Sequence, residues 1–217
     1  ATVVLIARNE ERLKETLAEM KQPEKHLYYS IDLCNSTALT SIVKDIVVKV
    51  GKISGLMNCA GISSVTPLKL ITRELFDTFF NNNVFSAINL TKEVCRMGNY
   101  SKEGCSIIFF SSVMGSVGEK GKALYSATKG AFRSLACELA TKNIRVNTVS
   151  PGVIVTPINA NQPYIADLDK RKALEGRHLL GLGETTDISH TCLFLISDAS
   201  RWITGQNIIV DGGYTVQ

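Results

Sequence analysis

The chain has 217 residues, of which 45% are hydrophobic and 20% charged, so it suits one globular domain and not a disordered chain. A formal net charge of +4 is too small to indicate a nucleic-acid partner by itself. The six cysteines and three histidines are scattered without a C-x-x-C pair, which predicts no metal site and is typical of reduced thiols in a cytoplasmic protein. No apolar stretch is long enough to predict a membrane span.

Strand and helix patterns alternate along the chain. Short β-branched or apolar runs predict strands at Thr2–Ile6, Leu27–Ile31, Leu56–Asn58, Ser106–Phe110, Ile144–Val149 and Ile208–Val210. Helical periodicity predicts helices at Asn9–Met20, Thr37–Val50, Arg73–Phe80, Val84–Met97, Tyr125–Thr141 and Asp187–Leu195. This order predicts an α/β fold, a Rossmann-type doubly wound parallel sheet that forms a single domain over residues 1–217.

Tyr125 and Lys129 stand four residues apart, and Ser112 follows an apolar run that ends at Phe110. Residues i and i+4 share one face of a helix. A lysine ammonium beside a phenol lowers a tyrosine pKa from about 10, so such a tyrosine can exchange a proton with a substrate oxygen. A serine at the end of a buried strand can hydrogen-bond the same oxygen. The pattern therefore predicts chemistry at a carbonyl or an alcohol.

With these residues the chain resembles the short-chain dehydrogenase/reductase family, from Thr2 to Thr215. A Tyr-x-x-x-Lys alone is a weak signal, whereas an ordered series of motifs is specific. The series reads Asp32-Leu33, Asn58-Cys59-Ala60-Gly61, Asn83, Ser112, Tyr125-x-x-x-Lys129, Asn147-x-x-x-Pro151-Gly152, Thr156, Thr204-Gly205-Gln206 and Val210-Asp211-Gly212-Gly213.

The resemblance implies that hydride passes between NADP(H) and a substrate carbon while Tyr125 transfers the proton. Lys129 would lower the tyrosine pKa and hold the nicotinamide ribose, and Ser112 would orient the substrate oxygen. Asn83, twenty-two residues after Gly61, matches a fourth catalytic residue whose backbone carbonyl holds a water. The neighbouring asparagines at 81 and 82 are alternatives, and the three together are also compatible with a simple helix kink.

The same resemblance implies where the adenosine half of the cofactor binds. Arg8 follows Ala7, where NAD-preferring relatives often carry Asp, and an arginine can bind the 2′-phosphate of NADP(H). NADP(H) is therefore predicted over NAD(H), unless Arg8 is only a solvated residue at a helix start. Asp32 and Leu33 would contact the adenine, although Asp32 could instead cap the helix that follows.

At the other end of the cofactor, the small residues of Asn58-Cys59-Ala60-Gly61 would let Asn58, Ala60 and Gly61 approach it closely. Cys59 replaces a second asparagine of the common family motif, and a reactive thiol is the rival interpretation. The backbone of Ile154 and the Thr156 hydroxyl would meet the nicotinamide amide, beside Tyr125 and Lys129.

The chain departs from the family pattern in two places. The family's first strand, Gly-rich turn and first helix are absent. We expect that strand to lie between Thr2–Ile6 and Leu56–Asn58, so both would lose a neighbour, and residues 1–217 alone should neither fold properly nor hold a dinucleotide well. A natural chain longer by about thirty residues, one strand–helix unit, is therefore predicted. Separately, the interval from Lys129 to Asn147 is short by about four residues, close to one helical turn.

The best single prediction of the substrate is a 3-oxoacyl-carrier-protein, which would make the protein a 3-oxoacyl-carrier-protein reductase. Sugar, steroid or other secondary-alcohol dehydrogenases are alternatives. Residues 157–180 correspond to a substrate lid, and its basic residues could meet an acidic carrier: Lys170, Arg171, Lys172 and Arg177. A non-catalytic dinucleotide-binding or scaffold protein is the rival class. The resemblance also implies a homotetramer or homodimer that pairs through helices Val84–Met97 and Tyr125–Thr141 and through the last strand with its Asp211-Gly212-Gly213 tail. The charge and the apolar pattern predict no nucleic-acid or membrane partner.

Overall fold

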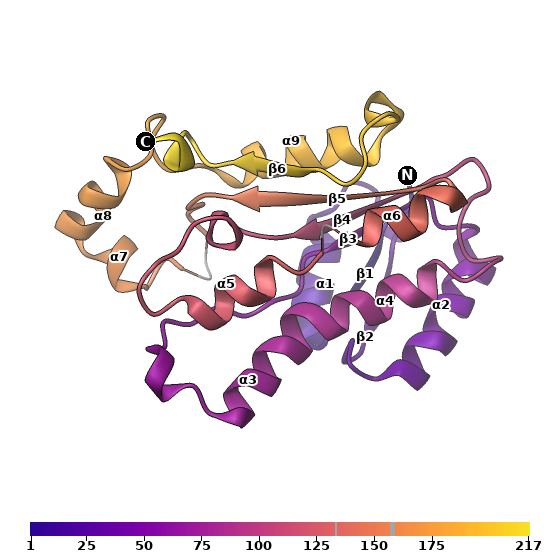
Figure 1. Ribbon diagram of the computed structural model, residues 1–217. Coiled ribbons are helices and arrows are strands. Elements are labelled where there is room, and N and C mark those ends of the chain that lie inside the picture. Colours follow the sequence, from indigo (N-terminus) through magenta and orange to yellow (C-terminus); the bar gives the residue numbers. More distant parts are fainter. Residues whose placement is uncertain (133, 157–158) are drawn as a thin grey trace.

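The computed structural model describes residues 1–132, 134–156 and 159–217. Each predicted strand is present, with ends that differ by one or two residues (Figure 1). The strands are β1 Val4–Ala7, β2 Leu27–Ser30, β3 Gly55–Asn58, β4 Cys105–Phe110, β5 Ile144–Pro151 and β6 Asn207–Val210. Every neighbouring pair runs parallel, which confirms the predicted α/β fold.

The strands form two separate sheets. One contains β1 and β2, and the other has the order β3-β4-β5-β6. Among the described residues, β1 and β3 share no ladder, so each has an edge without a strand partner. The prediction that these two strands would each lack a neighbour is confirmed.

The helices cover both faces of the larger sheet (Figure 1). They are α1 Glu10–Glu19, α2 Ser36–Val50, α3 Arg73–Phe80, α4 Ser86–Val94, α5 Ala123–Lys129, α6 Leu135–Leu139, α7 Pro163–Ala166, α8 Leu168–Glu175 and α9 Thr185–Ile196. Alternate residues of β4 point to opposite faces, as a strand requires. Ile107 and Phe109 join the core beneath α2, α4 and α6, while Ile108 joins the core beneath α9. This arrangement is the predicted doubly wound one.

The single helix predicted over Tyr125–Thr141 is wrong. Helix α5 ends at Lys129 with Gly130 as its C-cap, and α6 begins only at Leu135. Glycine is a poor helix former. Beyond it, the Phe132 ring stacks on Phe109 with ring centroids 4.4 Å apart. The short interval is thus accommodated by two short helices instead of one continuous helix.

A π-helical turn over Asn81–Phe85 joins α3 to α4. The sequence predicted two ordinary helices here, the second running on to Met97, whereas α4 ends at Val94. Turns of this kind inside α-helices occur often at functional sites. This one carries Asn83, whose side chain is buried. None of the helices in the described part of the chain is both long and apolar enough to cross a membrane.

Candidate active site

The predicted catalytic residues and the residues predicted for the nicotinamide end lie near the ends of the strands of the larger sheet. Asn58 ends β3, Ser112 follows β4, and Ile154 follows β5. Ligands of open parallel sheets bind beyond the carboxyl ends of the strands. Helix α5 packs against the turn after β4, at Val113–Gly115, and brings Tyr125 and Lys129 to the same place.

The Ser112 hydroxyl lies close to the Tyr125 phenol, an interaction that the sequence did not predict, since it placed both groups on the substrate oxygen. Burial of the phenol raises its pKa above the ordinary value, and the Ser112 hydrogen bond opposes that rise without cancelling it. The Ser112 hydroxyl also accepts a hydrogen bond of 3.2 Å from the Met114 backbone N–H, which orients it. Tyr125 is therefore a protonated phenol at neutral pH.

Lys129 does not have the predicted effect on Tyr125 in this structure. Its Nζ donates a 2.8 Å hydrogen bond to the carbonyl of Phe110 and lies 5.7 Å from the centroid of the Tyr125 ring. Burial lowers the pKa of Lys129 to about 8. The expected lowering of the tyrosine pKa is absent because the ammonium is held by a backbone carbonyl and faces the ring.

Asn83 is the asparagine that joins the site. Its Nδ2 donates to the Ile62 carbonyl and to Thr128 Oγ1, both at 3.0 Å, and its Oδ1 accepts from the Ile62 N–H at 2.7 Å. Asn82 instead turns back to the carbonyl of Thr78. Thr128 also donates to the Tyr125 carbonyl, so it links the π turn to α5. Sequence reasoning missed Thr128, although it stands inside the Tyr-x-x-x-Lys segment.

Two glycines permit close approach at the centre of the site. A Cβ on Gly61 would lie 3.2 Å from Asn83 Oδ1 and 3.4 Å from Lys129 Nζ, so any side chain there would fill the space beside the ammonium. A Cβ on Gly115 would lie 2.9 Å from Ser111 Oγ. Ser111, which the sequence did not single out, donates a 2.5 Å hydrogen bond to the Lys129 carbonyl. This bond links the turn after β4 to α5.

The predicted adenosine contacts lie after β1 and β2. Arg8 is exposed, and no carboxylate of the described residues forms an ion pair with it. Asp32 Oδ1 accepts from the Cys34 N–H at 2.9 Å. The alternative that Asp32 caps the next helix is wrong, because Asn35 caps α2. Asn89, which no sequence signal marked, holds this loop by donating to the Leu33 carbonyl at 2.8 Å.

The remaining predicted cofactor residues lie in ordered turns. Asn58 is buried and donates to Thr91 Oγ1 at 3.2 Å. Asn159 bridges the segment after β5: its Oδ1 accepts from the Thr156 N–H and its Nδ2 donates to the Ile154 carbonyl, both at 2.8 Å.

Ala60 and Cys59 both reach the surface. The protein nevertheless surrounds the Cys59 sulfur closely enough that burial raises its pKa to about 11. The thiol is thus protonated at neutral pH, which is unfavourable for the reactive-thiol interpretation.

The predicted lid contains α7 and α8, and its residues 157 and 158 lie outside the described part of the chain. Most of the basic residues proposed to meet a carrier already have partners. Arg171 pairs with Glu175 at 3.0 Å, Lys170 pairs with Asp167 at 3.4 Å, and Arg177 hydrogen-bonds the Tyr214 hydroxyl. These contacts leave less free positive charge than the sequence suggested.

The chain is similar to known oxidoreductases over nearly its whole length. A family model described as enoyl-(acyl carrier protein) reductase matches residues 1–215. The chain is 37% identical to a cyclopentanol dehydrogenase of Comamonas testosteroni, covering 99% of this chain and 87% of that one. It is 34% identical to a 3-oxoacyl-[acyl-carrier-protein] reductase of Thermotoga maritima, covering 100% and 88%.

Solved structures agree with the sequence relatives. ElxO with NADP bound has a TM-score of 0.88 at 27% identity, covering 99% of this chain and 88% of that one. A gluconate 5-dehydrogenase of Burkholderia cenocepacia in complex with NADP and tartrate has a TM-score of 0.88 at 26% identity, covering 99% and 85%.

The chain belongs to the short-chain dehydrogenase/reductase family. It is therefore an NAD(P)-dependent oxidoreductase that acts on alcohols or ketones. The predicted family, fold class and enzyme class are confirmed.

Proposed function

We propose that the protein is an NADPH-linked carbonyl reductase or secondary-alcohol dehydrogenase in which Asn83, Ser112, Tyr125 and Lys129 are catalytic. The observation that carries this proposal is the convergence on Tyr125: Ser112 hydrogen-bonds its phenol, and Lys129 faces its ring. Asn83 reaches the same helix through Thr128. A scaffold protein without catalysis has no need of this arrangement.

The cofactor, when bound, supplies or accepts the hydride. The chain's residues do the rest. Tyr125 donates its proton to the substrate oxygen during reduction, for which a protonated phenol is the required form. Ser112 donates a hydrogen bond to the same oxygen, a modest electrostatic stabilisation. The Lys129 ammonium binds ribose hydroxyls, and the backbone carbonyl of Asn83 holds a water on the proton path.

The residues present fit a nicotinamide dinucleotide. Gly61 lies next to the Lys129 ammonium, and a side chain at this position would crowd the ammonium and Asn83. The residues assigned to hold the cofactor are Arg8, Asp32, Leu33, Asn58, Ala60, Gly61, Tyr125, Lys129, Ile154 and Thr156. Preference for NADP(H) over NAD(H) is supported by Arg8, which is exposed and forms no ion pair with a carboxylate of the described residues. The NADP in the similar structures supports it as well.

Among substrates, a small cyclic or linear secondary alcohol or its ketone has support from the similarity to cyclopentanol dehydrogenase. A 3-oxoacyl carrier substrate has support from the Thermotoga relative, but the paired basic residues of the lid are unfavourable for a carrier surface. Sugars and steroids remain alternatives. We further infer a cytoplasmic protein, because all six cysteines are free. A homo-oligomer is inferred from the family resemblance.

Replacing Tyr125 with Phe tests the proposal. The change removes the proton-transfer group and keeps the ring, so turnover of a ketone panel should fall at least about a hundredfold while cofactor binding persists. Turnover is followed optically through NADPH oxidation, and cofactor binding by calorimetry. A control at a tyrosine outside the site, Tyr100→Phe, should keep the same turnover and cofactor affinity. Retention of most activity in Tyr125→Phe would remove Tyr125 from the mechanism.

A further inference from the structure

A second lysine lies beside Tyr125. Lys122 precedes the tyrosine by three residues and Lys129 follows it by four, a spacing that places all three on one helix face. Lys122 Nζ lies 5.6 Å from the Tyr125 ring centroid, and Lys129 Nζ lies 5.7 Å from it. Two cations therefore flank one phenol.

The two lysine ammonium groups differ in their hydrogen-bond acceptors. Lys129 is buried and donates to the Phe110 carbonyl, as an interior residue must. The Lys122 ammonium donates to the hydroxyl of the exposed Ser63 at 3.2 Å. Among the described residues no carboxylate forms an ion pair with Lys122.

This free charge is partly desolvated. Burial lowers the pKa of Lys122, and Glu119 opposes that change from a greater distance than an ion pair. A partly buried cation without a carboxylate partner is unfavourable unless a ligand supplies the opposite charge. Its hydrogen-bond partner, the Ser63 hydroxyl, is neutral, so the charge remains available to an anionic ligand.

The position of Lys122 is built by two turns that hold each other. The Thr66 N–H donates to the Gly121 carbonyl at 2.8 Å, beside Lys122. Gly121 has φ +80°, and a Cβ on it would lie 2.8 Å from the Val65 side chain, so only glycine permits this approach. The lysine is thus preorganised against the segment that carries Ser63.

A tyrosine of the predicted lid lies near Tyr125. Tyr164 of α7 is partly buried, and burial raises its pKa; Glu119 contributes to that rise. Tyr164 in turn raises the pKa of Tyr125, although less than burial does, so the two phenols are neighbours.

We propose that Lys122 and Ser63 form a subsite for a substrate carboxylate, so that the preferred substrates are short oxo acids and the corresponding hydroxy acids. The carbonyl lies at Tyr125 and Ser112 while the carboxylate binds Lys122 a few carbons away. This inference rests on the proposed function and adds its substrate class. The subsite would make the turn before α5, which carries Lys122, a determinant of substrate specificity.

The test compares pyruvate, acetoacetate and levulinate, each with its own methyl ester, as substrates of the holoenzyme. At least one acid should exceed its ester in kcat/KM. Lys122→Met should lower kcat/KM for that acid by about ten- to a hundredfold, the effect of losing a charge-assisted contact, and lower that for the ester much less. Calorimetric binding of the acid to the enzyme loaded with oxidised cofactor should weaken by the same factor.

Two further variants serve as controls. Lys122→Arg should restore most of the acid preference, and Lys120→Met, a change at an exposed lysine of the same turn, should retain it. Equal or better use of the esters by the wild type would overturn the subsite, as would an equal loss for acid and ester in Lys122→Met. If only neutral ketones are reduced, the subsite is wrong and the proposed function stands. If no carbonyl compound is reduced, the proposed function falls as well.

Discussion

At the scale of single residues, the protonation states in the site favour reduction. Burial keeps the Tyr125 proton in place and lowers the pKa of Lys129 to about 8. The sequence predicted which residues meet, because a helix guarantees the i, i+4 geometry. It could not predict their pKa directions, since these depend on desolvation by residues distant in the chain. It likewise missed Ser111 and Asn89, whose roles arise from tertiary contacts alone.

The lowered pKa of Lys129 predicts a stability effect. Its folded pKa of about 8 lies below the ordinary 10.5, so between these pH values the unfolded state binds more protons than the folded state. The unfolding free energy of the wild type, relative to Lys129→Met, should therefore increase as pH rises through this window. The gain should be about 1–3 kcal/mol in total, measured by urea denaturation at each pH.

A matched control separates this effect from general alkaline changes. Lys44→Met, at an exposed lysine of α2, should give a curve parallel to that of the wild type. A constant difference between wild type and Lys129→Met across the window would show that Lys129 titrates at its ordinary pKa.

At the scale of elements, the turn from β1 to α1 carries Arg8, the residue proposed to bind the 2′-phosphate of NADP(H). Arg8 extends from the end of β1, and Asn9 caps α1 by accepting from the Arg12 N–H at 2.9 Å. The sequence predicted this turn well, because a capping asparagine followed by acidic residues is a strong local signal. It failed at α5 and α6, where a shortened segment breaks a helix and the outcome depends on how Phe132 packs against β4.

Arg8 is predicted to set the preference of the protein for NADPH over NADH. Ala7→Asp combined with Arg8→Ser should shift preference toward NADH, because the carboxylate repels a 2′-phosphate and the charged contact is lost. The contact is worth about 1.5–3 kcal/mol, or about ten- to a hundredfold in affinity for NADPH. Titration of both cofactors by fluorescence measures the ratio. Arg12→Ser, at an exposed arginine of α1, should retain the wild-type ratio. A wild type that binds NADH as tightly as NADPH would contradict the assignment.

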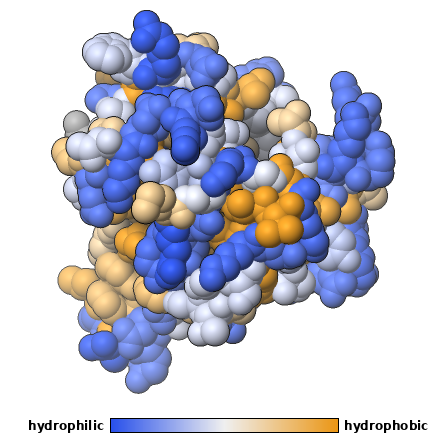
Figure 2. Space-filling view, turned by 90° about the vertical axis from the view of Figure 1, so that its right-hand side faces the viewer, coloured by the Kyte–Doolittle hydropathy of each residue, from blue (hydrophilic) through white to orange (hydrophobic). Residues whose placement is uncertain are grey.

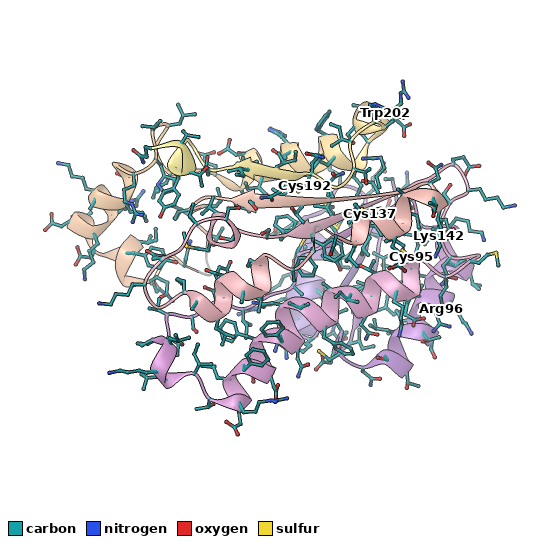
Figure 3. The ribbon with its side chains drawn as sticks, in the orientation of Figure 1. Cys95, Arg96, Cys137, Lys142, Cys192 and Trp202 are labelled. Atoms are coloured by element: carbon teal, nitrogen blue, oxygen red, sulfur yellow. The ribbon has the colours of Figure 1, made fainter. Side chains whose placement is uncertain are left out.

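At the scale of the whole molecule, apolar side chains gather on part of the surface. Figure 2 shows an apolar patch bordered by hydrophilic residues. The cysteines labelled in Figure 3 belong to three different helical segments: Cys95 after α4, Cys137 on α6 and Cys192 on α9. The free edges of β1 and β3 among the described residues were predicted from the order of motifs. The exposure of particular apolar side chains was not, because periodicity predicts which face is apolar but not what covers it.

The last prediction concerns assembly. The helices expected to pair between subunits present apolar side chains to solvent: Phe85, in the π turn, is 45% exposed and Ile88, on α4, is 37% exposed. A homo-oligomer would bury them, whereas a charge placed there would have to be desolvated on association. The wild type should therefore be a tetramer by light scattering at micromolar concentration, or a dimer if the break between α5 and α6 reduces the second helix surface.

Ile88→Glu should lower that mass toward a monomer without unfolding the chain, because its side chain is already partly in solvent. The matched control is Val48→Glu, the same apolar-to-charged change at an 84% exposed position on α2, which should leave the mass unchanged. Circular dichroism of both variants checks that the fold persists. If the wild type itself has the mass of a monomer, the proposed assembly is wrong, and the apolar side chains of α4 require another explanation.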